Sequence, residues 1–182
     1  MNYKDLLFAT CIFAFAVVLF GRTSTEESEI EKTVTISSNE INESSPSCLK
    51  MYYAIMKWSS VYQIPRSYAF GIASKETGYG GPFHWRYKHT QTSCVGAIGP
   101  MQIMPSTADL MWKGTRVSRT KLMNDVDFNV RTSMKLLRNL HNKYDDWKTV
   151  FGCYNTGRPM INQYAIDVFN HKPSWKLNTE SL

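Results

Sequence analysis

Acidic side chains are scarce in most of this sequence. Residues 47–182 contain 18 Lys and Arg but only 8 Asp and Glu, a net charge of +10, whereas residues 1–46 carry a net charge of −4. Such a basic region attracts polyanions. No winged-helix, zinc-finger or RNP pattern accompanies the charge, so we do not expect nucleic acid to be the partner.

Patterns typical of metal sites and of β-structure are also missing. The 4 cysteines and 4 histidines form no Cys-x-x-Cys or His-x-x-x-His spacing, and we therefore expect no metal and no other cofactor. No stretch alternates clearly between apolar and polar residues as a strand would, and no internal repeat is present. These absences predict a single, mainly α-helical domain.

Long apolar runs are limited to one segment near the start. Residues 6–20 are uncharged and mostly apolar, and as a helix they would span ~22 Å, short of the ~30 Å hydrocarbon core of a membrane. This length also fits the core of a signal peptide, but no good small-x-small cleavage site follows. We expect residues 1–21 to be a membrane anchor, with a cleaved signal peptide as the alternative. Residues 22–46 are rich in Ser, Thr, Glu and Asn and lack aromatics, which predicts a disordered linker.

Helical periodicity begins after this linker and covers residues 47–172, which leaves 173–182 as a C-terminal tail. Capping residues predict where the helices start and stop. We expect helices from Pro46, over 68–77 between Ser67 and Gly78, from Pro105, from Asn124, from Asp145 or Asp146 to Gly157, and from Pro159 to about Asn170.

Glu76 is the first candidate for chemistry. Helical spacing places it on one face with Ala69, Ile72 and Ala73, which are all apolar. Burial disfavours an ionised carboxylate, so we expect the pKa of Glu76 to be raised. A carboxylic acid that is still protonated near neutral pH can donate a proton to a leaving oxygen. The alternative is a Glu at a helix end that turns out to water, as most Glu do.

A glycine- and methionine-rich segment follows at residues 93–105. Gly96 and Gly99 permit backbone geometry that other residues resist. Gln102 offers one acceptor and two donors to a hydroxylated or acetamido-bearing ligand, and Met104 adds soft apolar surface. Taken alone, this segment would be a loop that enters a helix.

Three motifs in order resemble one known family. Glu76, the run SCVGAIGPMQIMPSTA at 93–108 and GCYNTG at 152–157 are similar to the motifs of the soluble lytic transglycosylase (SLT) domain, a branch of the lysozyme-like superfamily. The resemblance covers about 48–170 and implies a mainly α, lysozyme-like fold. It implies that Glu76 acts as acid and then base. It also implies glycan-binding or Glu-orienting roles for Ser93, Gln102, Met104, Tyr154 and Asn155, with Gly96 and Gly99 shaping the loop.

The sequence departs from the family pattern at a few positions. Thr77 replaces the Ser after the catalytic Glu and keeps its hydroxyl, and Pro100 replaces a Leu. Cys153 and Thr156 replace the two Ala of the third motif. The loop between Glu76 and Ser93 is longer than is typical and interleaves aromatic and basic residues. Its aromatics suit either sugar stacking or packing on the domain.

The resemblance implies a peptidoglycan lytic transglycosylase that cleaves the β-1,4 MurNAc–GlcNAc bond and leaves a 1,6-anhydroMurNAc end. Such an enzyme would act on glycan strands in the cell envelope, periplasmic or otherwise outside the cytoplasm, either anchored or secreted. The alternatives are a hydrolytic muramidase of the goose type and a non-catalytic wall-binding module of an envelope-spanning secretion, conjugation or phage assembly. Hydrolysis commonly needs a second carboxylate, and Asp109, Asp167 and Glu180 belong to no motif.

An exported location would also allow a disulfide. Cys48, Cys94 and Cys153 lie in the globular region, and three pairings are open. Cys94 and Cys153 each neighbour a residue of the motifs, so we expect that pair first. A catalytic thiol is disfavoured, since no His stands in a matching motif.

Overall fold

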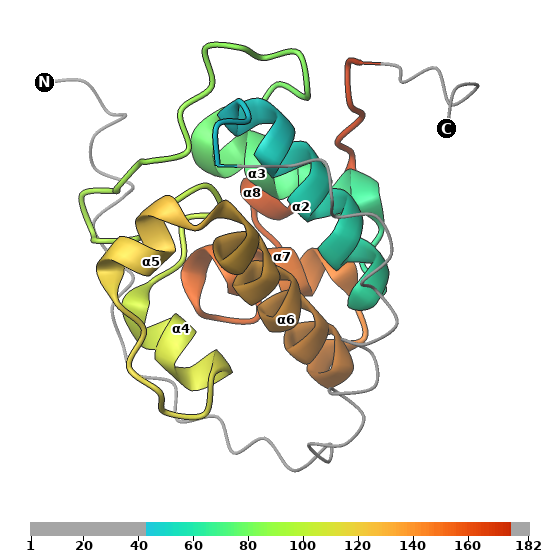
Figure 1. Ribbon diagram of the computed structural model, residues 1–182. Coiled ribbons are helices and arrows are strands. Elements are labelled where there is room, and N and C mark those ends of the chain that lie inside the picture. Colours follow the sequence, from blue (N-terminus) through green and yellow to red (C-terminus); the bar gives the residue numbers. More distant parts are fainter. Residues whose placement is uncertain (1–42, 176–182) are drawn as a thin grey trace, which may run out of the picture.

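The computed structural model describes residues 43–175, which fold into helices without a strand (Figure 1). The helices are α2 (Ser47–Val61), α3 (Arg66–Thr77), α4 (Pro105–Met111), α5 (Arg119–Asn124), α6 (Val126–Tyr144), α7 (Trp147–Thr156) and α8 (Gln163–Phe169). Isolated bridges join Ile98 to Thr92 and to Ile103. The predicted mainly α-helical fold is confirmed for these residues.

The predicted anchor at 1–21 and most of the linker at 22–46 lie outside the described residues. From residue 43 to residue 175, no helix combines the length and apolar character needed to cross a membrane.

Helix α6 is the central element of the domain. It packs against α2, α4, α5 and α7, and Figure 1 shows it running diagonally through the middle of the molecule. Val126, Val130, Met134 and Leu137 repeat at helical spacing and are all buried. This apolar stripe fixes which face of α6 meets the core.

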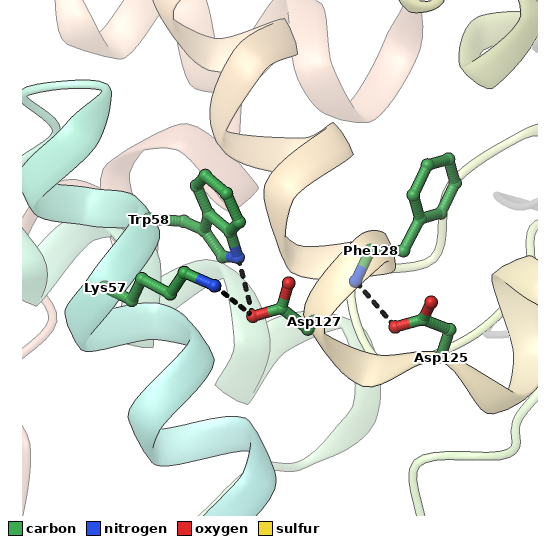
Figure 2. Close-up of polar contacts among 5 residues, drawn as sticks. All are labelled: Lys57, Trp58, Asp125, Asp127 and Phe128. Atoms are coloured by element: carbon green, nitrogen blue, oxygen red, sulfur yellow. Dashed lines mark hydrogen bonds and ion pairs between the residues drawn. The ribbon is translucent and has the colours of Figure 1, made fainter. Parts of the chain in front are cut away.

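A carboxylate joins α2 to the start of α6 (Figure 2). Trp58 donates its indole N–H to Asp127 Oδ1 at 2.9 Å, and Lys57 Nζ lies 3.3 Å from the same oxygen. Asp127 is in the first turn of α6, where the helix dipole favours a negative charge. The contact fixes α2 beside the part of α6 that carries the buried Asn129.

The expected start of α6 at Asn124 is wrong by one residue. Asp125 is the cap, and its Oδ1 accepts the Phe128 amide at 2.9 Å (Figure 2). Asn124 instead ends α5, a short helix that the sequence did not predict. Ser118 caps α5 by accepting the Lys121 amide at 3.1 Å, so a short capped helix stands directly before α6.

Proline and asparagine account for the other displaced helix starts. Pro65 rather than Ser67 precedes α3, and its carbonyl accepts the Tyr68 amide at 2.9 Å. Pro46 is likewise the residue before α2, not within its first turn. The last helix begins after Asn162, whose side chain accepts the Ala165 amide at 2.9 Å, so the expected start at Pro159 is wrong.

The helix ends at Asp146, Gly78 and Gly157 agree with the sequence. Of the two candidates, Asp146 caps α7 by accepting the Thr149 amide at 2.8 Å, while Asp145 closes α6 in a left-handed conformation. Gly78 ends α3 and Gly157 ends α7, both left-handed with φ of 67° and 73°.

The first residues of the predicted C-terminal tail contact the core, and the expected disulfide is not formed. Trp175, in the predicted tail at 173–182, packs edge-on against Phe70 at 5.1 Å between ring centroids. All three cysteines of the described region are free thiols. Cys94 is exposed on a turn, whereas Cys153 is buried in α7 and Cys48 in α2, and the expected Cys94–Cys153 pair is not formed.

Candidate active site

Glu76 lies in the last turn of α3, with its carboxyl directed at α8. The Tyr164 hydroxyl donates to Glu76 Oε1 at 2.6 Å. Loss of hydration on burial raises the pKa of Glu76 to about 7, and the hydrogen bond from Tyr164 opposes part of that rise. The raised pKa agrees with the apolar face that the sequence predicted. A carboxyl group with this pKa exists in both protonation states near neutrality.

The Tyr154 hydroxyl contacts the glycine-rich loop that follows Glu76 rather than the Glu76 carboxyl. Its hydroxyl donates to the Met101 carbonyl at 2.7 Å and lies 3.0 Å from the Ser133 hydroxyl. Burial and, secondly, the nearby charge of Glu76 raise the pKa of Tyr154. Tyr154 therefore stands close to Glu76, but it holds the glycine-rich loop, and Tyr164 holds the carboxyl.

Thr77 connects the end of α3 to two segments of the connection that follows. Its hydroxyl lies 2.9 Å from the Pro100 carbonyl, to which it can donate, and 2.9 Å from the Tyr87 hydroxyl, from which it can accept. Thr77, which stands where the family pattern has Ser, thus makes these contacts with the hydroxyl group that both residue types carry. The contact fixes the 93–104 loop next to the catalytic candidate.

Two glycines shape that loop for different reasons. Gly99 has φ 77°, and a Cβ there would lie 2.3 Å from the Leu122 carbonyl and 2.4 Å from Asn129 Nδ2. Gly96 has φ 89°, but a Cβ there would meet nothing within 4 Å. Both positions favour glycine by conformation, and only Gly99 also needs it for space.

The buried side-chain amide of Asn129 on α6 also holds the 93–104 loop. Asn129 Nδ2 donates to the carbonyls of Ile98 and Leu122 at 2.9 Å each, and its Oδ1 accepts the Met101 amide at 3.0 Å. Asn129 was not among the site residues predicted from the sequence. A signal was present, because position 129 shares the apolar face of α6 with Val126 and Val130.

The remaining candidates mostly support the loop by their own hydrogen bonds. Ser93 Oγ accepts the Ala97 amide at 3.0 Å, which closes the turn around Gly96. Gln102, with φ 49°, donates its side-chain amide to the Gly99 carbonyl at 2.8 Å, and its side-chain oxygen has no partner among residues 43–175. Met104 is half-buried at the start of α4.

Asn155 is set apart from this group. It is exposed at the end of α7, and its Oδ1 accepts the Asn162 amide at 3.1 Å. The structure therefore places Gln102 within the 93–104 loop and Tyr154 against it, and it uses Asn155 to join α7 to the start of α8.

The aspartates of the described region have other partners. Asp109 accepts the Val117 amide at 2.7 Å, and Asp167 pairs with Lys75 at 2.5 Å. Within residues 43–175, no second carboxylate contributes to the pKa shift of Glu76. In the same region, no three His, Cys, Asp or Glu side chains come together as a metal site would require.

Comparison with protein-family models identifies one family. The model of the transglycosylase SLT domain matches residues 53–175. A solved structure of the 70-kDa soluble lytic transglycosylase in complex with bulgecin A is 21% identical, with a TM-score of 0.50, over 80% of this chain and 21% of that chain. The lytic transglycosylase Slt of Pseudomonas aeruginosa, an inactive mutant, is 23% identical, with a TM-score of 0.46, over 58% of this chain and 16% of that chain.

The chain thus corresponds to about a fifth of the length of these two proteins or less. None of the curated proteins compared with it matches. The family match covers most of the described residues and includes every candidate site residue from Glu76 to Asn155. The chain belongs to the transglycosylase SLT domain family.

Proposed function

We propose that this protein is a peptidoglycan lytic transglycosylase. It cleaves the β-1,4 bond between N-acetylmuramic acid and N-acetylglucosamine and leaves a 1,6-anhydromuramoyl end. One observation carries the proposal: in an SLT-family fold, burial raises the pKa of Glu76 to about 7 beside the loop that holds the family motif. Such a carboxyl can give and then take a proton at neutral pH.

Glu76 performs both proton transfers in this mechanism. The protonated carboxyl donates to the glycosidic oxygen as the bond from that oxygen to the muramic acid C1 breaks. The resulting carboxylate then removes the proton of the C6 hydroxyl while O6 bonds to C1. No water is consumed, and Glu76 ends as it began. The internal hydroxyl is held close to C1, which gives it a large effective concentration.

Tyr164 fits the second half of this cycle. Its hydroxyl donates to Oε1, and a donated hydrogen bond favours the ionised carboxyl. Tyr164 therefore stabilises the carboxylate that forms after the first proton transfer. It also fixes the orientation of Glu76, since the bond connects α3 to α8.

Within residues 43–175, no other carboxylate contributes to the raised pKa of Glu76, and this favours the proposed function over a muramidase. Glycoside hydrolases commonly place two carboxyl groups about 5–9.5 Å apart. In the described region, Asp109 and Asp167 are engaged in other contacts, and neither shifts the pKa of Glu76. A single carboxyl that acts twice needs an internal nucleophile, which the muramoyl C6 hydroxyl supplies.

The first test is whether the protein lyses peptidoglycan at all. Zymography on gels that contain purified sacculi separates an enzyme from a wall-binding module. We expect a cleared zone for the wild-type chain. A protein that binds the sacculi and clears nothing would instead be the non-catalytic module of an envelope assembly.

A further inference from the structure

The loop that follows Glu76 presents two kinds of aromatic residue. Tyr79 and Tyr87 are buried and pack edge-on against each other at 5.0 Å. Phe83 and Trp85 lie between them in the sequence, and they are 61% and 63% exposed. Packing on the domain therefore explains the two tyrosines and leaves Phe83 and Trp85 facing solvent.

The exposed pair stands on a fixed backbone. The Tyr87 amide donates a hydrogen bond to the His84 carbonyl at 2.8 Å, and the Trp85 amide donates one to the Phe83 carbonyl at 3.0 Å. Trp175 packs so closely on Gly81 that a Cβ at Gly81 would lie 2.5 Å from its ring. The loop is thus held at both ends, and the exposed rings are presented with little freedom to lose on binding.

The same loop is fastened to the candidate active site. The Tyr87 hydroxyl lies 2.9 Å from the hydroxyl of Thr77, the residue next to Glu76. Trp85 is two residues from Tyr87, so chain connectivity keeps its Cα within roughly 25 Å of that of Glu76. A polymer bound at Glu76 can therefore reach the exposed rings.

Basic side chains accompany the rings. Arg86 and Lys88 are exposed, and within residues 43–175 neither forms an ion pair. Phe83 and Trp85 form an edge-on pair at 6.4 Å between ring centroids. Arg86 and Lys88 follow this pair closely in the sequence, and we call the four exposed residues the 83–88 platform.

We propose that the 83–88 platform is a second binding surface for peptidoglycan, separate from the residues around Glu76. Sugar rings of the glycan strand stack on Phe83 and Trp85, while Arg86 and Lys88 contact carboxylates of the stem peptides. The proposal rests on the proposed function, since it names the same polymer. Two linked contacts on one strand raise the local concentration of substrate at Glu76.

Binding to purified sacculi is the direct test. The background carries Glu76→Gln, so that the polymer stays intact. We expect the double substitution Phe83→Ser/Trp85→Ser to weaken co-sedimentation by about tenfold or more. Tyr53→Ser is the matched control, because Tyr53 is an aromatic on α2 that is 47% exposed. Equal binding by the double variant and by the control would overturn the proposal.

Two further experiments test whether the cations bind stem-peptide carboxylates and whether the platform binds a membrane instead. The double substitution Arg86→Gln/Lys88→Gln should make sacculus binding less sensitive to salt. Sacculi stripped of stem peptides lack the carboxylates. They should therefore bind the protein with Arg86 and Lys88 intact as weakly as intact sacculi bind the double variant. Vesicles of anionic lipid test a membrane surface instead. Aromatic-dependent binding to vesicles with unchanged binding to sacculi would contradict the proposal.

Kinetics distinguish this proposal from the proposed function. In chains that keep Glu76, the double variant should raise KM for sacculi, leave kcat unchanged and cleave a short muramoyl tetrasaccharide as the wild type does. The conservative variant Trp85→Tyr, which keeps an aromatic ring, should retain most of the binding to sacculi. This result would exclude misfolding as the cause of the loss in the double Ser variant. If the wild type cleaves nothing but binds sacculi through Phe83 and Trp85, the platform stands and the proposed function fails.

Discussion

At the scale of single residues, Glu76 carries the chemistry. Glu76→Gln keeps the shape of the side chain and cannot give up a proton. We expect lysis of sacculi to fall by about 10²-fold or more, because general acid–base catalysis is typically worth ~10²–10⁴-fold. Circular dichroism should show the domain still folded. Activity above about a tenth of the wild-type value would remove Glu76 from this role.

Tyr164 sets the pH range in which Glu76 can act as an acid. Its hydrogen bond lowers the pKa of Glu76 relative to burial alone. Tyr164→Phe removes that bond, so the pKa should rise, and the protonated acid should persist to higher pH. For the wild type we expect kcat/KM to fall above about pH 7, where Glu76 loses its proton, and for Tyr164→Phe we expect this fall to begin at higher pH.

Tyr154→Phe is the matched control for this shift. It removes a hydroxyl that donates to the Met101 carbonyl and not to Glu76. Its alkaline limb should stay where the wild type has it, with a smaller loss of activity than Glu76→Gln causes. An unchanged limb in Tyr164→Phe would mean that the Tyr164 bond does not control this ionisation.

The residues that the sequence singled out and those it missed differ in a physical way. Glu76, Gly99 and Gln102 stand in short local motifs, so their spacing is visible in one dimension. Tyr164 is 88 residues from its partner Glu76 in the sequence, and Asn129 is 28 residues from its partner Met101. The place of Asn129 on an apolar helix face is visible in the sequence, but the partners of both residues depend on how the helices pack, which local spacing does not encode.

At the scale of elements, the 93–104 loop is the part whose backbone matters most. Gly99→Ala places a methyl group against the Leu122 carbonyl and Asn129, and we expect it to lower the free energy of unfolding by at least about 2 kcal/mol. Gly96→Ala meets open space and should cost about 1 kcal/mol through its positive φ. Urea unfolding of both variants measures the difference, and equal losses would contradict the clash.

Helix ends were less predictable than helices. Asp125 and Asn124 are adjacent residues that both favour capping, and the sequence alone preferred the wrong one. Capping at Asp125 is decided by the short α5 helix, which uses Asn124 as its last residue. The existence of α6 followed from its apolar periodicity, which tertiary packing reinforces.

At the scale of the whole molecule, the proposed function requires the domain to lie outside the cytoplasmic membrane, where peptidoglycan is found. We propose that residues 1–21 anchor it and that residues 22–46 connect the anchor to the domain. Protease treatment of spheroplasts should release a fragment that begins within residues 22–46. A domain that survives this treatment and appears only after lysis would contradict the topology.

The chemical form of the product tests the central claim most directly. Wild-type protein is incubated with purified sacculi, and the soluble muropeptides are analysed by mass spectrometry, with Glu76→Gln as the blank. A single carboxyl that acts twice predicts non-reducing 1,6-anhydromuramoyl ends, one water lighter than the hydrolytic product. Predominantly reducing, fully hydrated ends would show a muramidase and contradict the account.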